Sequence, residues 1–147
     1  MSAVAYTSAE LIGIGARGGW FTPRMLQMWS EKDGFVIPEI QGHRRLYSPA
    51  QAAMVLIVAA FKKKGVGLQT IRFGLPAIEA ALKDRRGPAR LKIGMTTKGH
   101  TRAWWSGVAL LTWMVDTDAA IWLVDAGELL RALPDYPGWT RKVGIDE

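Results

Sequence analysis

An arginine-rich turn, Gly42–Ser48, holds the side chains of this chain that are best suited to bind a ligand. A second segment, Gly65–Arg72, follows it and begins a helix. Guanidinium groups on a turn that is held by an aromatic residue, beside a capped helix, can pair with the phosphates of a nucleic acid. No paired acid and base, no nucleophile with a base and no phosphate-binding loop stands out. The residues therefore indicate binding and not an enzyme, and no catalytic residue is predicted.

The positive charge of the 147-residue chain is concentrated in its first two-thirds. The net charge is +6, with 14 Lys and Arg against 6 Asp and Glu in residues 1–94, and 5 against 7 in residues 95–147. The basic part is the one expected to meet a polyanion such as double-stranded DNA. Charge alone does not decide this, because an ordinary globular protein can also carry a solvated basic face.

Composition argues against several other classes of protein. The chain has no cysteine, which excludes a disulfide framework and a thiolate metal site and fits a cytoplasmic protein. Its longest apolar run, Ala52–Phe61, is shorter than the roughly 20 residues that cross a membrane, and no secretory signal is visible. Asp116 and Asp118 are more typical of a turn than of a metal site, so neither a metal nor a cofactor is predicted.

Capping residues mark the first two helices. Thr7 and Glu10 have the spacing of a capping box and predict a first helix of about two turns, which the glycines that follow would end. Thr22 precedes a proline and predicts the start of a second helix, Pro23–Lys32. Two short helices around a tight glycine turn are typical of a helix-turn-helix.

The segment after the second helix predicts a wing, meaning a small two-stranded β-hairpin that consists of Phe35–Ile37, a break at Pro38, Ile40, a turn at Gly42 and Leu46-Tyr47. Ser48 then caps the strongest helix pattern of the chain, Pro49–Lys64. A fourth helix, Leu68–Lys83, carries an apolar stripe, and the proline inside it is expected to kink or break it.

The remainder of the chain has the composition of a small β-rich appendage. Residues 116–118 predict a hairpin turn, and Ala126–Leu133 predicts a final short helix. Three runs are rich in β-branched and aromatic residues: Arg90–Met95, Ala103–Val115 and Ala120–Val124.

The expected fold class is a mainly α, winged helix-turn-helix N-terminal part with four helices and a two-stranded wing, followed by the β-rich appendage. The predicted divisions are a DNA-binding domain in residues 1–84, a linker in residues 85–94, and a tryptophan-rich segment for dimerisation, interaction or effector binding in residues 95–147.

Five motifs resemble, in order, those of the MerR-type winged-helix transcription regulators. They are Tyr6-Thr7, Thr22–Trp29, Gly34–Pro38, Arg44–Ser48 and Gly65–Arg72, and the likeness covers about residues 5–80. It implies a four-helix winged domain that binds promoter DNA, usually as a homodimer, with a recognition helix in the major groove and the wing on the flanking backbone. RNA polymerase and a small-molecule effector are further partners that such a regulator can have.

The predicted DNA-binding residues lie on the second helix, on the wing and at the end of the third helix. Arginine and glutamine on one exposed helix face can read guanine and adenine, although two solvated helix residues are the alternative. The arginines of the wing can neutralise phosphates. The lysine at the end of the third helix would interact favourably with the helix dipole even without DNA. The whole set is Thr22, Arg24, Gln27, Met28, His43, Arg44, Arg45, Tyr47 and Lys63.

Tryptophans gather in the C-terminal part of the chain. They can line a pocket for a planar effector, or they can form a core or a subunit interface. The interface reading leads to an alternative function, an antitoxin or adaptor whose C-terminal module binds a protein and whose DNA binding is secondary. The residues concerned are Trp104, Trp105, Trp113 and Trp122.

Overall fold

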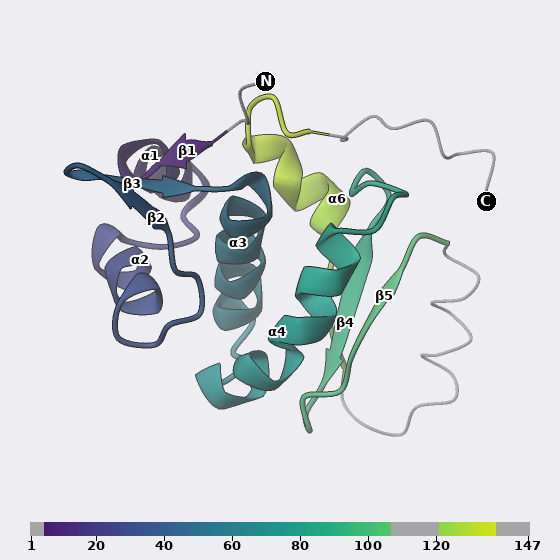
Figure 1. Cartoon of the computed structure of the whole chain (residues 1–147). Helices are drawn as coiled ribbons and strands as arrows, with labels where there is room; N and C mark the ends of the chain where they lie inside the picture. Colours follow the sequence, from purple (N-terminus) through teal and green to yellow (C-terminus); the bar gives the residue numbers. More distant parts are fainter. Residues whose placement is uncertain (1–4, 107–120, 138–147) are drawn as a thin grey trace.

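The computed structural model describes residues 5–106 and 121–137 (Figure 1). Its helices are α1 (Ser8–Gly18), α2 (Pro23–Ser30), α3 (Pro49–Lys63), α4 (Leu68–Leu82) and α6 (Ala126–Leu129), which continues into a short 3-10 helix, η1 (Leu130–Ala132). Its strands are β1 (Tyr6–Thr7), β2 (Glu39–Gln41), β3 (Arg44–Tyr47), β4 (Lys92–Thr96), β5 (Thr101–Trp104) and β6 (Ile121–Val124). None of the helices described is both long and apolar enough to cross a membrane.

Side-chain caps begin the helices at the residues that the sequence indicates. Thr7 and Glu10 form the predicted capping box, with both reciprocal hydrogen bonds present. The hydroxyl of Thr22 accepts a hydrogen bond from the backbone N–H of Met25 at 3.2 Å. Ser48 and its partner three residues on form a second capping box at the start of α3. Each cap satisfies N–H groups that the first turn of a helix leaves without a partner.

Helix α1 is longer than the two turns predicted, since its glycines do not end it. The helix has 11 residues and closes only at Gly19, whose φ of 66° is the left-handed conformation that suits a glycine C-cap. Inside the helix, a Cβ on Gly15 would lie 2.7 Å from the ring of Phe21. This glycine is therefore required by the packing of the ring and not by a turn of the backbone.

The wing is part of a three-stranded antiparallel sheet, with strand order β1-β3-β2. The predicted strand Phe35–Ile37 is wrong: Phe35 and Val36 are buried, and their N–H groups donate to the carbonyl of Trp29 at the end of α2. The outer strand of the hairpin begins instead at Glu39. Gly42, with a φ of 64°, forms the tip of the hairpin, and the name "wing" is used below for residues 39–47.

Helix α3 lies in the middle of the molecule, with α1, α2 and the wing on one side and α4 and the second sheet on the other (Figure 1). Its residues from Ala52 to Ala59 are buried. Helix α4 is continuous through Pro76, so the predicted break is wrong. The helix approaches the second sheet closely at Gly74, where a Cβ would lie 2.7 Å from the terminal carbon of Met95.

The second sheet shares one hydrophobic core with the helices. Its antiparallel strand order is β5-β4-β6, and Ile93 and Met95 of β4 are fully buried. Strand β4 begins at Lys92, inside the predicted linker, and the core cluster includes residues from α1, α3, β4 and η1 alike. Packing therefore does not separate the described residues before position 84 from those after position 94, and the described part of the predicted appendage contains β5, β6, α6 and η1.

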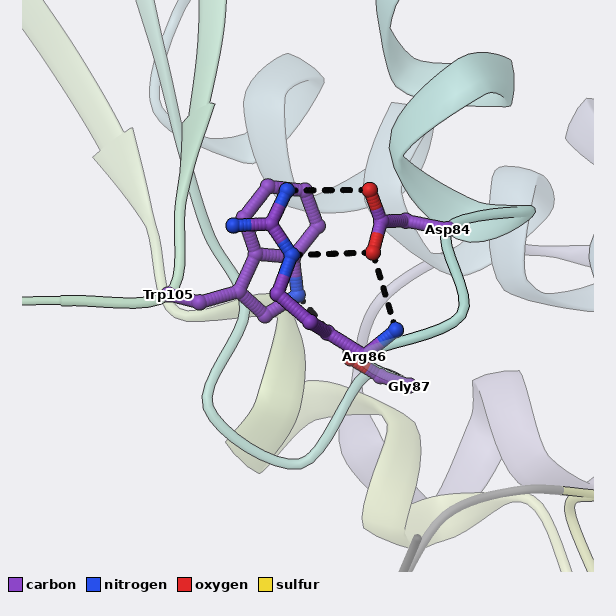
Figure 2. Close-up of polar contacts among 4 residues, drawn as sticks. All are labelled: Asp84, Arg86, Gly87 and Trp105. Carbon is purple, nitrogen blue, oxygen red and sulfur yellow. Dashed lines mark hydrogen bonds and ion pairs between the residues drawn. The ribbon is translucent and has the colours of Figure 1, made fainter. Parts of the chain in front are cut away.

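A tight polar corner joins α4 to the second sheet within the predicted linker (Figure 2). The guanidinium of Arg86 donates to both carboxylate oxygens of Asp84 at 2.9 Å and lies 3.6 Å from the centre of the Trp105 ring. The indole N–H of Trp105 donates to the carbonyl of Gly87 at 3.0 Å. These contacts make the segment a fixed turn and assign Trp105 a structural role.

The Asp84 corner makes stability depend on pH at the acid end. Hydrogen bonds from Arg86 are the main reason that the pKa of Asp84 falls from 3.8 to about 2. A lowered folded-state pKa stabilises the fold above the unfolded-state pKa, and this contribution disappears as the pH falls toward 2. We expect Asp84→Asn to lower the free energy of unfolding at pH 6 by about 1 kcal/mol, a value reduced for the partial exposure of the pair.

Urea titrations of the wild-type protein and of Asp84→Asn at pH 6 and pH 2.5 measure this difference. The gap between the two proteins should shrink at pH 2.5, because the unfolded wild-type chain then binds a proton at Asp84 that it must release on folding. A gap of the same size at both pH values would mean that the charge of Asp84 is not the source of the stabilisation.

Candidate nucleic-acid interface

Helix α2 presents one polar face to solvent. Its N-terminal cap and the proline at its first position begin the helix after the turn from α1, and Leu26 and Trp29 are buried on its inner side. Arg24, Gln27 and Met28 are exposed. The spacing of these residues follows the helical repeat of 3.6 residues, so that their side chains project from one side.

The wing stands next to this face and is anchored to α2 by Tyr47. The Tyr47 side chain is fully buried, and its hydroxyl lies 2.8 Å from the hydroxyl of Ser30 at the end of α2. The prediction that Tyr47 contacts DNA therefore needs correction, because a side chain with no accessible surface cannot touch a duplex. Its position explains instead how the wing keeps a fixed orientation relative to α2.

An open groove of about 1040 Å³ runs between α2, the wing and the first turn of α1. Four cationic side chains and one carboxylate line it, a net charge of +3 with histidine neutral. Seven of the nine predicted DNA-binding residues line this groove: Arg24, Gln27, Met28, His43, Arg44, Arg45 and Tyr47. The groove thus brings together residues that are up to 23 positions apart in the sequence, from Arg24 to Tyr47.

The two wing arginines differ in their surroundings. Arg44 and its neighbour His43 are exposed beside the hairpin tip. Within the described part of the chain, the Arg44 side chain forms no hydrogen bond and no ion pair, and only its backbone pairs with β2. Arg45 instead forms an ion pair with Glu31 of the segment that follows α2, with 2.7 Å between the nitrogen and the carboxylate oxygen. Arg44 is therefore the wing arginine that is available to a phosphate without giving up another partner.

The Glu31 carboxylate is shared between the wing and α2. A hydrogen bond from Arg45 is the main cause that lowers the pKa of Glu31, and a hydrogen bond from Gln27 lowers it further. The same ion pair raises the pKa of Arg45. Both groups are charged at neutral pH. Gln27, which is predicted to read a base, and Arg45, which is predicted to contact a phosphate, thus lie beside the same carboxylate.

Two predicted contacts lie outside the groove lining. The hydroxyl of Thr22 serves as the cap of α2, and the ammonium of Lys63 donates to the carbonyl of Gly19 at 3.3 Å, at the C-terminal end of α1. A cation near the C-terminal carbonyls of a helix is stabilising without any ligand. The sequence left open that Lys63 interacts with the dipole of its own helix. The contact in the structure is with the C-terminal end of a different helix, α1.

The groove also contains charged residues that reasoning from the sequence missed. Glu31 and Lys32 follow α2 and line the groove beside Arg24 and Gln27. Glu31 lies four residues after Gln27 and seven after Arg24, which is one continuous face of a helix. This spacing is visible in the sequence, so continuing the helix face of Arg24 and Gln27 by one more turn would have identified Glu31.

The tryptophans do not form one described pocket. Trp104 is buried and pairs across the sheet with Lys92, whereas Trp122 is half-buried and pairs with Met95. Positions 92 and 95 lie on opposite faces of β4 because side chains alternate along a strand, so Trp104 and Trp122 face different sides. Trp113 and the turn predicted at residues 116–118 lie outside the described residues.

Comparison with protein-family models decides the character of the groove-forming segment. A model described as "MerR HTH family regulatory protein" matches residues 9–76, which run from the start of α1 into α4. Residues 9–76 are therefore similar to the helix-turn-helix regulators that this model describes. The resemblance noted over about residues 5–80 is confirmed. Neither the curated proteins nor the solved structures that we searched gave a match.

The matched residues include most of α1 together with α2, the wing and α3, and they contain all the residues that line the groove except Thr7 and Ser8. The family that the model describes is one of helix-turn-helix regulators. The match supports a DNA-binding transcription regulator, in agreement with the basic charge of the first two-thirds of the chain.

Proposed function

We propose that this chain is a sequence-specific transcription regulator whose α2 enters the major groove while the wing lies on flanking phosphates. The observation that carries the proposal is the groove that joins Arg24 and Gln27 of α2 to Arg44 of the wing. A helix that presents its first turns to base edges, with a separate cationic element on the backbone, is the usual division of labour in such proteins.

Each exposed residue of α2 has a base that suits it. The fork of Arg24 can donate two hydrogen bonds to guanine, the amide of Gln27 can pair with adenine, and Met28 can make apolar contact with a thymine methyl. Met28 is 37% exposed and lines the groove beside Gln27. These assignments make α2 the element that selects a sequence.

We also propose that the regulator acts as a homodimer in the cytoplasm, with RNA polymerase or a small-molecule effector as further partners. A two-fold protein reads two half-sites in an inverted repeat, and their spacing reports the geometry of the dimer. Sequencing of the fragments that the purified protein retains from sheared genomic DNA tests both sequence specificity and symmetry. Fragments without a shared motif would argue against a sequence-specific regulator.

The alternative of an antitoxin or adaptor has less support. That reading needs a C-terminal module that binds a protein on its own, whereas the strands of this part contribute Ile93, Met95 and Val124 to the same core as the helices. No feature of the described residues favours a separate protein-binding module over a structural extension of the DNA-binding domain.

Arg44 provides the direct test of the wing. We expect Arg44→Ala to make the slope of log K against log salt less steep by about 0.9, because one fewer phosphate is neutralised on binding. Fluorescence anisotropy at several salt concentrations measures the slope. Lys98→Ala, which removes an exposed cation from the turn between β4 and β5, is the matched control and should leave the slope unchanged. An unaltered slope for Arg44→Ala would contradict the placement of the wing on the backbone.

A further inference from the structure

Glu31 is the only carboxylate among the residues that line the groove of the described structure. It follows the last residue of α2, on the same face as Arg24 and Gln27. A negative charge in this position repels the phosphates of a duplex, and a surface built only for affinity would avoid it. Its presence therefore calls for a function other than attraction of DNA.

The contacts of Glu31 indicate that function. Its carboxylate oxygen lies 2.7 Å from a guanidinium nitrogen of Arg45, and Gln27 lines the same groove one turn earlier on α2. The side chains of Arg45 and Glu31 are 34% and 46% exposed. Exposed ion pairs contribute little to stability, so removal of the carboxylate is expected to free Arg45 without unfolding the protein.

We propose that Glu31 is a built-in counter-ion that masks Arg45 from DNA, and that it thereby lowers the affinity and the salt dependence of binding. This inference rests on the proposed DNA-binding function. Glu31 acts through Arg45 and is a positioning residue, not a base contact of its own. In the free protein, Glu31 of the same chain is therefore the anionic partner of Arg45.

The balance of ions gives the proposal a quantitative signature. While Arg45 stays paired with Glu31, the pair carries no net charge and replaces no counter-ion on the duplex, so Arg45 adds nothing to the dependence of binding on salt. Without the carboxylate, Arg45 is free to neutralise a phosphate and contributes about 0.9 to the slope of log K against log salt.

Glu31→Gln tests the masking, since it keeps the shape of the side chain and removes its charge. With the full-length chain and a fluorescent duplex, we expect the slope to become steeper by about 0.9 and the affinity at 0.15 M salt to rise about fivefold. The double variant Glu31→Gln with Arg45→Gln should return to the slope of the wild-type protein. Glu39→Gln, which removes an exposed carboxylate from the same wing but outside the groove lining, should leave the slope unchanged.

The outcomes separate this inference from the function on which it rests. If Glu31→Gln binds with the slope and affinity of the wild-type protein while Arg44→Ala still makes the slope less steep, the wing binds DNA and the masking role is wrong. A steeper slope that persists in the double variant would assign the gain to another cation and also overturn the masking of Arg45. If the folded wild-type protein, checked by circular dichroism, binds no duplex at all, the proposed function and this inference both fail.

Discussion

Tyr47→Ala should lower the free energy of unfolding by about 3–5 kcal/mol, the range found when a large aromatic side chain is removed from a core. The side chain is fully buried at the junction of β3, α2 and α3, and its removal leaves a cavity there. The loss also leaves the hydroxyl of Ser30 without its partner. Thermal and urea unfolding of the variant measure the effect, which is the largest on stability that we expect from any groove residue.

Tyr47→Phe is the control for a structural role. It keeps the ring and removes only the hydrogen bond, so a loss of about 1–2 kcal/mol is expected. Its salt dependence of DNA binding should match that of the wild-type protein, because a buried hydroxyl neutralises no phosphate. A stable Tyr47→Phe protein whose binding slope fell would show that the hydroxyl reaches the DNA after all.

Arg24→Ala should weaken binding to the preferred duplex by about 1–3 kcal/mol, or about fivefold to 150-fold, which is the usual value of a bidentate contact to guanine. Arg24 lies in the first turn of α2 and is exposed to the groove. Binding to duplexes of unrelated sequence should change much less, since only the charge and not the base contact matters there. Competition titrations with the two kinds of duplex measure the ratio.

Arg24→Lys separates the charge of this residue from its shape. Lysine keeps the positive charge but lacks the planar fork, so it should retain binding to unrelated sequences and lose most of the discrimination. An equal loss of affinity on every duplex for Arg24→Ala would place Arg24 on a phosphate, and α2 would then need a different docking geometry.

Local signals were sufficient to predict most of the helices. A helix start depends on a few neighbouring residues, and Thr7, Thr22 and Ser48 each form the expected cap. The first helix end was misplaced because the cost of a glycine within a helix is small compared with the packing it permits. At Gly15, the space left by the missing side chain is filled by the ring of Phe21.

Contacts between distant segments were the part that the sequence could not provide. Phe35 and Val36 are apolar, and nothing in their local sequence distinguishes a strand from a buried loop. The difference comes from the carbonyl of Trp29, which accepts hydrogen bonds from both of their N–H groups. In the same way, the ion pair of Arg45 joins residues 14 positions apart on different elements. The number of cationic residues in the sequence is therefore larger than the number that can bind a phosphate without losing a partner within the chain.

The hydrogen bond from the hydroxyl of Tyr6 to the carbonyl of Pro134 bears on the order in which the protein is made. The bond measures 2.7 Å and spans 128 positions, and burial raises the pKa of Tyr6 to about 12, so the donor keeps its proton. Translation supplies residue 6 long before residue 134, and β1 pairs with the base of the wing. Because residue 134 follows every described helix and strand along the chain, this contact can form only after all of them have been synthesised.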